Sequence, residues 1–338
     1  MLILMEPGAT AEQMRAVLET LENAGVRAVV QDGAEALYIL APHASKALNP
    51  DRLETMGGVR KVVPITSPFK LASSDSAPGR TAVEVRGVKI GGPDLALVAG
   101  PCGVESREQL FATARYVAEA GVKLLRAGAF KPRTSPYSFQ GLGLEGLKLL
   151  DEARTEFDLG IVTEATEIET FDDVERIADL IQIGARNMQN FALLKRAGRS
   201  EKPVLLKRGP AATLEEWLYA AEYVLSEGNR NVILCERGIR TFEDHVRFTL
   251  PLASVPYLQS KTHLPVMVDP SHGTGKSSLV STMARASVAA GADGLIVEIH
   301  PHPEKALSDG YQALTPDMFT RMMRECHRVA EAIGKTMG

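Results

Sequence analysis

Short apolar runs alternate with amphipathic stretches along the first 66 residues of the chain. The runs MLILME, RAVVQDG, ALYILAP and VRKVVPI have the pattern of strands, whereas TAEQMRAVLETLENAG and NPDRLETMGG have the pattern of helices. In the first helix the apolar face consists of Met14, Val17, Leu18 and Leu21. The resulting βαββαβ order is typical of a ferredoxin-like fold. We therefore predict a ferredoxin-like domain over residues 1–66.

The pattern changes after a segment rich in Ser, Pro and Gly, residues 67–79, which we predict to be a linker. From residue 80 to 338 a hairpin, TAVEVRGVKIGG, precedes continuous apolar runs that are separated by helical patterns. The runs are LALVAG, VKLLRAG, GIVTEA, LIQIGA, PVLLKRG, VILCERG, PVMVDPS and GLIVEIH. Such runs are typical of parallel strands covered on both faces. Eight units favour an α/β fold of the TIM (β/α)8 barrel type, with an open doubly wound sheet as the alternative.

Helix starts support this division of the barrel. Ser106 with Gln109, and Thr213 with Glu216, have the spacing of a capping box. The sixth helix has the weakest pattern, and we place it within IRTFEDHVRFTLPLASV, residues 239–255.

Composition narrows the class of protein. The net charge of -4 excludes a globally basic nucleic-acid-binding protein, so any cationic site must be a local concentration of charge. Cys102, Cys235 and Cys326 have no CxxC spacing and do not suggest a disulfide framework, and we interpret the last two as packing residues. The N-terminal apolar run is too short for a signal peptide, and no run of about 18 apolar residues could span a membrane. We expect a cytoplasmic protein.

The carboxyl ends of the strands form the active-site face of a TIM barrel. Polar or ionisable residues follow every predicted strand of this chain, namely Cys102, Arg126 with Lys131 and Arg133, Glu164, Arg186, Lys207, Glu236 with Arg237, Asp269 with His272, and Glu298. A purely structural barrel would place such groups no more at one end than at the other. We therefore predict a functional site at this end.

Cations dominate the predicted site: Arg126, Lys131, Arg133, Arg186, Lys207 and Arg237. Together they would repel one another without an anionic ligand, and guanidinium and ammonium groups bind phosphates and carboxylates. Six cations suit about two phosphates and a carboxylate, although each cation taken singly could be a solvated side chain. Because neighbours in a strand point to opposite faces, only one of Lys207 and Arg208 should line the mouth, and only one of Glu236 and Arg237.

A second group of residues could bind a metal ion: Cys102, His272, Glu298 and Asp309. Thiolate, imidazole and carboxylate ligands suit Zn, Fe or Mn-like divalent ions. Spacing leaves two alternatives open. Cys102 could be a small buried residue, and His300 and His302 in EIHPHP could be ligands instead.

The sequence GTGKSS at residues 273–278 resembles the end of a Walker A loop. The residue five positions before Gly275 is Pro270, where that motif requires glycine. We expect only a flexible loop at the barrel mouth here.

Several motifs form a recognisable set: AGPC, RAGAFKPRTSPYSFQG, QIGARNMQNF, LLKRG, CERGIRTFE, DPSHGTG and VEIHPHPEKALSDG. Over about residues 80–335 they resemble 3-deoxy-D-arabino-heptulosonate 7-phosphate (DAHP) synthase, and the first domain is similar to the regulatory domain of some members. The resemblance implies the first step of the shikimate pathway, which leads to chorismate and the aromatic amino acids. In this step phosphoenolpyruvate and D-erythrose 4-phosphate condense to DAHP and phosphate.

The resemblance also implies roles for individual residues. One divalent ion, such as Mn²⁺, Fe²⁺, Zn²⁺ or Co²⁺, would be held by Cys102, His272, Glu298 and Asp309. Phosphoenolpyruvate would be held by Arg126, Lys131, Arg186, Lys207 and Arg237. Erythrose 4-phosphate would meet Pro132, Arg133 and Thr134, and Glu164 would lie near phosphoenolpyruvate and a reactive water. We expect Lys131 either to deliver a proton, with a pKa lowered by the guanidiniums around it, or only to position the substrate.

Other functions and roles are alternatives to these expectations. The sibling 3-deoxy-octulosonate 8-phosphate synthase uses arabinose 5-phosphate and has an Asn-containing segment in place of KPRTS. The presence of KPRTS in this chain favours the four-carbon sugar as its substrate. A metal-dependent hydrolase would need fewer cations, and an amino-acid sensor would have broken site positions. The resemblance implies a homo-tetramer with feedback inhibition by Tyr or Phe through residues 1–66, although that domain could only stabilise an oligomer.

Overall fold

The computed structural model describes residues 1–32, 37–41, 48–77, 79–133 and 135–337. The chain divides into two compact units, Met1–Arg80 with Ser260–His263, and Thr81–Gln259 with Leu264–Gly338. The domain limits expected from the sequence, at residues 66 and 79, stay predictions. Among the described residues no helix is both long enough and apolar enough to cross a membrane.

The first unit has the predicted βαββαβ order. Its elements are β1 (Leu2–Met5), α1 (Ala11–Asn23), β2 (Val29–Asp32), β3 (Leu37–Leu40), α2 (Pro50–Glu54) and β4 (Val59–Val63). The strands form an antiparallel sheet in the order β2-β3-β1-β4. Thr10 and Gln13 form a complete capping box at the start of α1, and Val17 and Leu21 on its apolar face are buried against the sheet. The ferredoxin-like prediction is confirmed.

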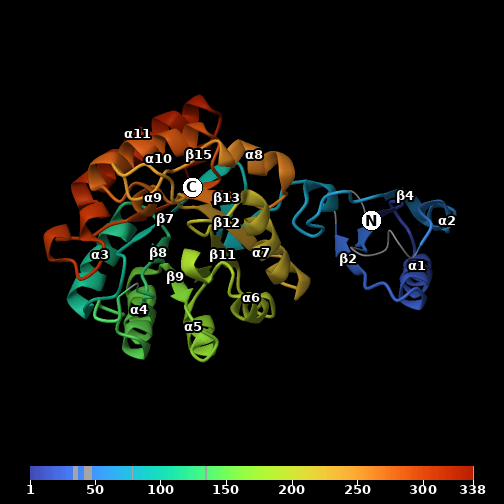
Figure 1. Cartoon of the computed structure of the whole chain (residues 1–338), viewed down its shortest axis with the longest axis horizontal. Coiled ribbons are helices and arrows are strands. Elements are labelled where there is room, and N and C mark those ends of the chain that lie inside the picture. The colour runs from blue at the N-terminus through green and yellow to red at the C-terminus, as the bar shows by residue number, and fades with distance from the viewer. Residues whose placement is uncertain (33–36, 42–47, 78, 134, 338) are drawn as a thin grey trace. The chain divides into compact units, whose positions relative to one another are not determined.

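The second unit is a closed barrel of parallel strands (Figure 1). The strands are β7 (Asp94–Gly100), β8 (Leu124–Arg126), β9 (Gly160–Ala165), β10 (Leu180–Ile183), β11 (Val204–Lys207), β12 (Val232–Glu236), β13 (Val266–Val268) and β14 (Gly294–Glu298). Each strand pairs with the next, and β14 pairs in parallel with β7 from Gly294↔Ala96 to Glu298↔Gly100. This last pairing closes the sheet, so the TIM barrel is confirmed and the open sheet is excluded.

Helices surround the strands (Figure 1). They are α3 (Arg107–Glu119), α4 (Leu144–Phe157), α5 (Phe171–Ile177), α6 (Phe191–Gly198), α7 (Leu214–Ser226), α8 (Ser254–Lys261), α9 (Pro270–Thr274), α10 (Ser277–Ala289) and α11 (Pro316–Ala332). The capping box predicted at α7 is complete. At α3 the Ser106 side chain accepts from the Gln109 N–H, but the Gln109 side chain accepts from the Glu105 N–H instead of closing the box.

Short elements complete the described chain. They are the 3₁₀ turns η2 (Ser74–Ser76), η3 (Ala185–Asn187), η4 (Pro303–Lys305) and η5 (Gly310–Gln312), and the strand β15 (Thr336–Met337), which pairs with the start of β7.

Two predictions about the barrel mouth were wrong. The sixth helix, α8, occupies only the end of the predicted range and continues to Lys261, while residues 237–253 form a non-helical loop that we call the mouth segment. Residues 273–278 are not a loop throughout, because 273–274 end α9, 277–278 begin α10, and only Gly275 and Lys276 lie between the two helices. Asp269 caps α9 by accepting from the His272 N–H, a tertiary arrangement that the sequence pattern did not indicate.

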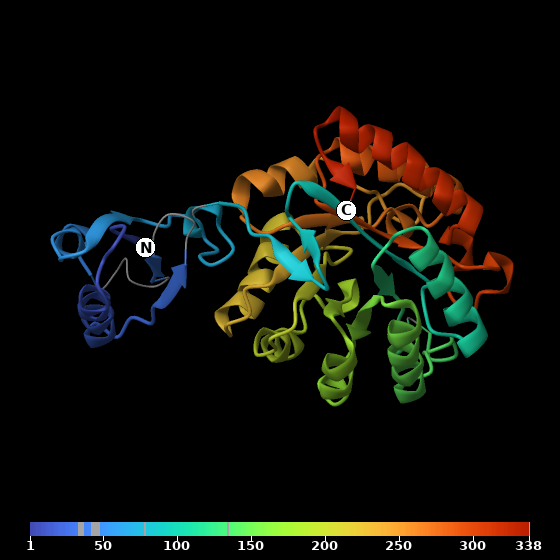
Figure 2. The ribbon, with the colours of Figure 1, turned by 180° about the vertical axis from the view of Figure 1, so that it is seen from behind.

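The predicted hairpin closes the amino-terminal end of the barrel. Its strands β5 (Val83–Val85) and β6 (Val88–Ile90) are joined by Arg86 and Gly87, which both have positive φ, as a tight hairpin turn requires. Val83, Val85 and Ile90 belong to the same buried cluster as the side chains that fill the barrel interior. Figure 2 shows the hairpin, coloured cyan, at this end of the strands. The opposite end is left for the site.

Candidate functional site

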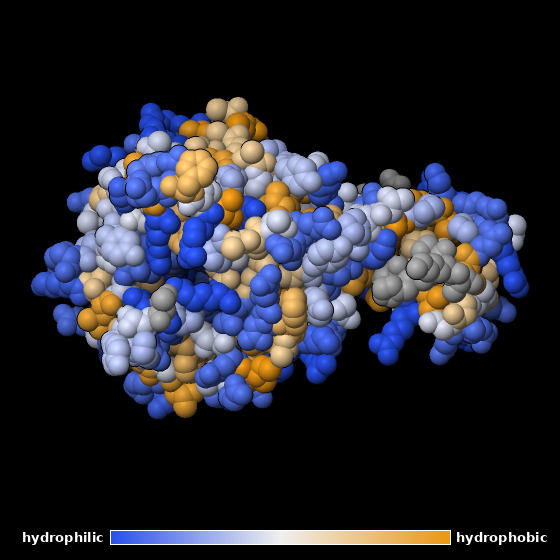
Figure 3. All heavy atoms as spheres, viewed as in Figure 1, coloured by the Kyte–Doolittle hydropathy of each residue, from blue (hydrophilic) through white to orange (hydrophobic). Residues whose placement is uncertain are grey.

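The carboxyl ends of the barrel strands enclose a cavity of about 260 Å³. In Figure 3 strongly hydrophilic side chains surround a hollow on this face. The residues of the sequence prediction that line the cavity are Arg126, Lys131, Pro132, Arg133, Glu164, Arg186, Lys207, Arg237, His272 and Asp309. Thr134, which was also predicted, lies outside the described residues.

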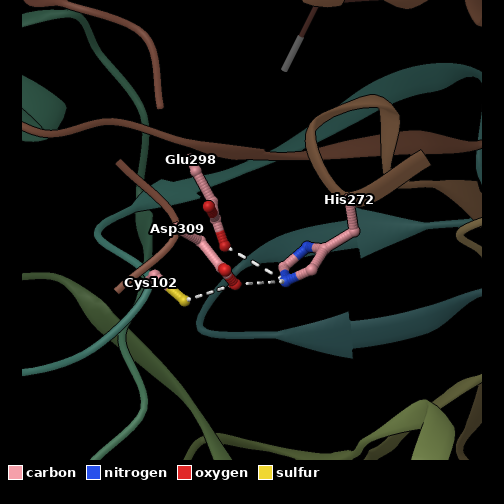
Figure 4. A group of neighbouring side chains, drawn as sticks. All are labelled: Cys102, His272, Glu298 and Asp309. Atoms are coloured by element: carbon pink, nitrogen blue, oxygen red, sulfur yellow. Dashed lines mark hydrogen bonds and ion pairs between the residues drawn. The ribbon is translucent and has the colours of Figure 1, made fainter. Parts of the chain in front are cut away.

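Four potential metal ligands meet at one side of the cavity. The side chains of Cys102, His272, Glu298 and Asp309 come from two loops, the helix α9 and the strand β14, and they point toward one another (Figure 4). His272 Nε2 is 3.2 Å from Glu298 Oε1 and 4.0 Å from Asp309 Oδ2, and Cys102 Sγ is 3.5 Å from the same Asp309 oxygen. All four donor atoms lie within 4.8 Å of one another.

Asp269 fixes the orientation of His272. Its Oδ2 atom is 2.8 Å from His272 Nδ1, while Oδ1 accepts from the His272 backbone N–H. Because an ionised carboxylate only accepts, the proton belongs on Nδ1 and the lone pair of Nε2 faces the cluster. Burial lowers the pKa of the His272 imidazole, while Asp269 and Glu298 act in the opposite direction. A carboxylate behind a histidine in this way is typical of metal sites.

The two carboxylates of the cluster are ionised. Burial raises the pKa of the Glu298 carboxyl, but His272 and Arg126 outweigh it, and the pKa lies below its usual range. Burial likewise opposes ionisation of Asp309, yet His272 and then Arg247 hold the pKa of this carboxyl below its ordinary value. Burial and then Glu298 raise the pKa of the Cys102 thiol, and a bound cation would favour its thiolate.

This donor set fits a divalent metal ion. A tetrahedral ion with bonds of about 2.0–2.3 Å has ligand atoms about 3.3–3.8 Å apart, close to the 3.2, 3.5 and 4.0 Å separations observed. The rival histidines face elsewhere: His300 Nε2 is 3.4 Å from Glu105, and His302 Nδ1 is 3.6 Å from Glu304. Cys235 and Cys326 are buried in the barrel and in α11.

The chain itself neutralises several cations of the cavity. Arg126 Nη1 is 2.6 Å from Glu298 Oε1, and Lys207 Nζ is 2.5 Å from Asp269 Oδ2. From the sequence we expected these cations to repel one another without an anionic ligand. The acidic partners of Arg126 and Lys207 reduce that repulsion, and the sequence pattern did not indicate them. Neighbouring residues point to opposite sides: Arg208 pairs with Glu236 at 2.7 Å, away from the cavity that Lys207 lines.

Arg237 differs from these paired cations. Its side chain is buried, yet its guanidinium makes no hydrogen bond or ion pair with the part of the chain that the structure describes. The guanidinium lies 4.1 Å from the centre of the Phe248 ring. Burial lowers the pKa of Arg237, Asp269 raises it, and the nearby Arg247 and Arg186 lower it further. A buried, unpaired guanidinium beside other cations is a site for an anion.

Lys131 does not have the lowered pKa that we expected. Its Nζ is 3.0 Å from both the Sγ atom and the carbonyl oxygen of Cys102. Burial does lower the pKa of this amine and Arg126 adds to that effect, but Cys102 and Glu164 outweigh them and the pKa is raised. The expectation counted the guanidiniums around the amine but left out Cys102 and Glu164. Lys131 is therefore an ammonium at neutral pH.

Glu164 lies at the end of β9, where Gln182 of β10 donates a hydrogen bond of 3.1 Å to its Oε2. A Cβ on Gly184 would lie 2.0 Å from Glu164 Oε1, so only glycine leaves room for this carboxylate. The Gln182 side chain and the space left by Gly184 thus hold Glu164 at the cavity wall.

Several lining residues were missed by the sequence analysis, namely Ser135, Ser138, Gln182, Arg247 and Tyr311. Gln182 could have been noticed as a polar residue in an apolar strand. Arg247 carried no such signal, because the pattern placed it in the sixth helix.

Comparison with known proteins agrees with this geometry. The model of the "DAHP synthetase I family" matches residues 70–334, and that of the "DAHP synthase ferredoxin-like domain" matches residues 1–67. Phospho-2-dehydro-3-deoxyheptonate aldolase of Thermotoga maritima is 46% identical over 334 residues, 99% of each chain. 2-Dehydro-3-deoxyphosphooctonate aldolase of Syntrophotalea carbinolica is 33% identical over 262 residues, covering 72% of this chain and 94% of the relative.

Solved structures give the same result. A crystal structure of phospho-2-dehydro-3-deoxyheptonate aldolase (DAHP synthase) from Thermotoga maritima covers 100% of this chain and 99% of its own, with 45% identity and a TM-score of 0.79. A truncated form of 3-deoxy-D-arabino-heptulosonate 7-phosphate synthase from the same organism covers 80% of this chain and 100% of its own, with 46% identity and a TM-score of 0.76. The chain belongs to the DAHP synthetase I family.

Proposed function

We propose that this protein condenses phosphoenolpyruvate with D-erythrose 4-phosphate and water to give DAHP and phosphate, the first step of the shikimate pathway. The observation that supports the proposal is one cavity with a Cys-His-Glu-Asp donor cluster at one side and several Arg and Lys side chains in its lining. The chain belongs to the DAHP synthetase I family. A hydrolase of one phosphate ester would need the cluster but not so many cations. An inactive sensor would have lost donors or cations, and both sets are complete.

The cations divide between the two substrates. Phosphoenolpyruvate carries a phosphate and a carboxylate, and we assign it to Arg126, Lys131, Arg186, Lys207 and Arg237. Arg237 is suited to bind an anion, since its buried guanidinium makes no hydrogen bond or ion pair with the described residues. We assign erythrose 4-phosphate to Pro132, Arg133 and Thr134 on the loop that follows β8.

We assign one divalent metal ion to Cys102, His272, Glu298 and Asp309. When bound, it supplies Lewis acidity that polarises the aldehyde of erythrose 4-phosphate. The identity of the ion, among Mn²⁺, Fe²⁺, Zn²⁺ and Co²⁺, is left to the experiment below.

The residues of the chain then hold the reacting groups together. The cations fix phosphoenolpyruvate so that its C3 can bond to the aldehyde carbon, and the aldehyde oxygen takes up a proton. Positive charge develops at C2, where water adds and loses a proton, and phosphate leaves with cleavage of the C–O bond. Glu164 lines the cavity and stabilises the charge at C2 or orients this water. Lys131, an ammonium beside Cys102, is placed to donate the proton or to position the substrate.

A related family activity differs from the proposed one in the sugar phosphate that it uses. The relative from Syntrophotalea carbinolica acts, by its name, on an eight-carbon product. The sequence KPRTS on the loop after β8 supports the four-carbon aldose for this chain.

We further propose that Tyr or Phe inhibits the enzyme through the ferredoxin-like domain, and that the enzyme is a cytoplasmic homo-tetramer. The match of residues 1–67 to the DAHP synthase ferredoxin-like domain supports a regulatory role for this unit.

The test is consumption of phosphoenolpyruvate by the metal-stripped protein after each divalent ion is added back, with either erythrose 4-phosphate or arabinose 5-phosphate. We expect turnover that requires both the ion and the four-carbon sugar, with one phosphate released per condensation. Faster turnover with arabinose 5-phosphate would move the protein to the sibling activity. Phosphate release without any aldose would indicate a hydrolase.

A further inference from the structure

The mouth segment brings an arginine to the donor cluster that the sequence gave no reason to expect there. The Arg247 N–H donates to Thr274 O at 3.0 Å, and the Phe248 N–H donates to Gly273 O at 3.1 Å. Gly275 has a φ of +65°, and a Cβ at this position would lie 2.4 Å from the Cβ of Arg247. The segment is therefore packed directly on the short helix α9, which carries His272.

The guanidinium of Arg247 makes two contacts next to the cluster. Its Nη1 atom is 3.4 Å from Asp309 Oδ2 and donates to Gln312 Oε1 at 2.9 Å. Gln312 in turn donates from Nε2 to Glu298 Oε2 at 2.8 Å. Arg247 and Gln312 thus connect the two carboxylates through a continuous chain of polar contacts.

The orientation of the Gln312 amide follows from its partners. An arginine only donates hydrogen bonds and an ionised carboxylate only accepts them. The amide oxygen must therefore face Arg247, and the amide nitrogen must face Glu298. The side chain of Gln312 has an exposed fraction of 0%, so water cannot replace either partner.

Each oxygen of Glu298 is held by a different residue. Oε1 accepts from Arg126 Nη1 at 2.6 Å, and Oε2 accepts from Gln312 Nε2 at 2.8 Å. A second arginine bonded directly to Glu298 would compete with a bound cation for the charge of the carboxylate. The neutral amide of Gln312 restrains the carboxylate without adding a full charge to it.

We propose that Arg247 and Gln312 act together as positioning residues, which hold Asp309 and Glu298 in the arrangement that binds a divalent cation. The inference rests on the proposed metal-dependent function. It deepens that function by naming residues outside the four ligands that set the affinity for the ion. Neither residue is required to touch a substrate.

The experiment measures the affinity of the metal-stripped full chain for Co²⁺ or Zn²⁺ by competition with a chromophoric chelator. The variants are Gln312→Met, which keeps side-chain length, and Arg247→Met, which keeps the apolar stem of the side chain; both remove the hydrogen bonds. We expect each to lose about 10–100-fold in metal affinity. The double variant should lose little more than either single variant, because both break the same chain of contacts. Arg247→Lys, which keeps a charged donor, should recover part of the affinity.

Gln259→Met is the matched control, since the Gln259 amide donates to Gly291 O at 2.8 Å, remote from the cluster. It should bind the ion as the unaltered chain does. Thermal unfolding of each metal-free variant checks that it is folded. If Gln312→Met unfolds, Arg247→Met alone decides the question, because this side chain is only partly buried.

Three outcomes would overturn the inference. They are unchanged metal affinity in the folded single variants, fully additive losses in the double variant, and loss of aldose-phosphate binding by Arg247→Met with normal metal affinity. The last would make Arg247 an anion-binding residue. Failure of the proposed function is seen separately, as an unaltered chain that binds the ion but does not consume phosphoenolpyruvate.

Discussion

At the scale of single residues, Asp269 contacts both the proposed metal cluster, through His272, and the cations of the cavity, through Lys207. One of its oxygens accepts from Lys207 at 2.5 Å and from His272 Nδ1 at 2.8 Å, and its side chain is fully buried. Burial alone would raise the pKa of this carboxyl, but His272 and Lys207 hold it well below the ordinary value. One buried charge therefore orients a proposed metal ligand, His272, and an ammonium of the proposed anion site, Lys207, at the same time.

Replacing Asp269 should therefore affect both ligands of the enzyme. We expect Asp269→Asn to weaken metal affinity by about 10–100-fold and to raise the KM for phosphoenolpyruvate, because Lys207 loses its counter-ion and its position. Chelator competition and steady-state kinetics measure the two effects. Asp293→Asn is the control, since Asp293 is equally buried but pairs with Lys335 at 3.5 Å, away from the cavity. A loss in metal affinity with normal KM would show that Lys207 does not depend on this carboxylate.

A second prediction concerns the thiol of the cluster. Cys102→Ala removes one of four donors, and we expect loss of the tightly bound ion and of turnover by at least about 100-fold. Metal content after dialysis and the rate with added ion are the measurements. Cys326→Ala serves as the control, because Cys326 is buried in α11 and only packs there. Near-normal metal retention in Cys102→Ala would remove Cys102 from the ligand set.

At the scale of elements, the non-helical path of the mouth segment places Arg247 and Phe248 beside the proposed site. An extended path from β12 lets Arg247 reach Asp309 while Phe248 lies against Arg237. The Phe248 ring lies 4.1 Å from the Arg237 guanidinium, whose N–H groups make no hydrogen bond with the described residues. A cation–π contact of this kind contributes about 0.5–2 kcal/mol.

We predict that the aromatic ring of Phe248 contributes to the binding of phosphoenolpyruvate. Phe248→Leu keeps an apolar side chain but removes the ring, so we expect the KM for phosphoenolpyruvate to rise about 2–30-fold with little change in kcat. Phe248→Tyr should behave as the unaltered enzyme. Phe242→Leu, in the same segment but 95% exposed, should change nothing. Equal kinetics of the Leu and Tyr variants would mean that the ring adds only packing.

At the scale of the whole molecule, the barrel carries every described residue of the proposed site, and the ferredoxin-like unit carries none. A small domain that adds nothing to the chemistry is suited to regulation. If Tyr or Phe binds to it, inhibition requires a coupling free energy of typically about 1–3 kcal/mol between the two sites.

Removing the first unit should separate regulation from catalysis. A chain that begins at Gly79 should keep its turnover within a few-fold, because the barrel carries every described residue of the proposed site. It should lose any inhibition by Tyr or Phe, which we expect at millimolar concentration in the full chain. Initial rates with and without each amino acid test this. A full-length enzyme that does not respond to either amino acid would leave the domain a stabilising role only.

The sequence by itself determined the fold class and most of the site. Period-2 and period-3.6 patterns are local, so they predicted the βαββαβ unit and the eight barrel strands. Chain topology then brings the residues after parallel strands together at one end, which is why Cys102, Arg126, Glu164 and His272 could be placed there in advance.

Only the tertiary structure decided how the charges are paired and where Arg247 lies. Ion pairs such as Arg126 with Glu298 join residues 172 positions apart, and no local pattern encodes them. The raised pKa of Lys131 depends on Cys102 and Glu164, whose distances to its amine are set by packing. The mouth segment was expected to contain the sixth helix, but Ile239 and Thr249 pair with each other, and Arg247 and Phe248 donate to α9. Non-local contacts outweigh helix propensity there, because each residue other than Gly and Pro contributes only a few tenths of a kcal/mol to that preference, about 0.7 at most.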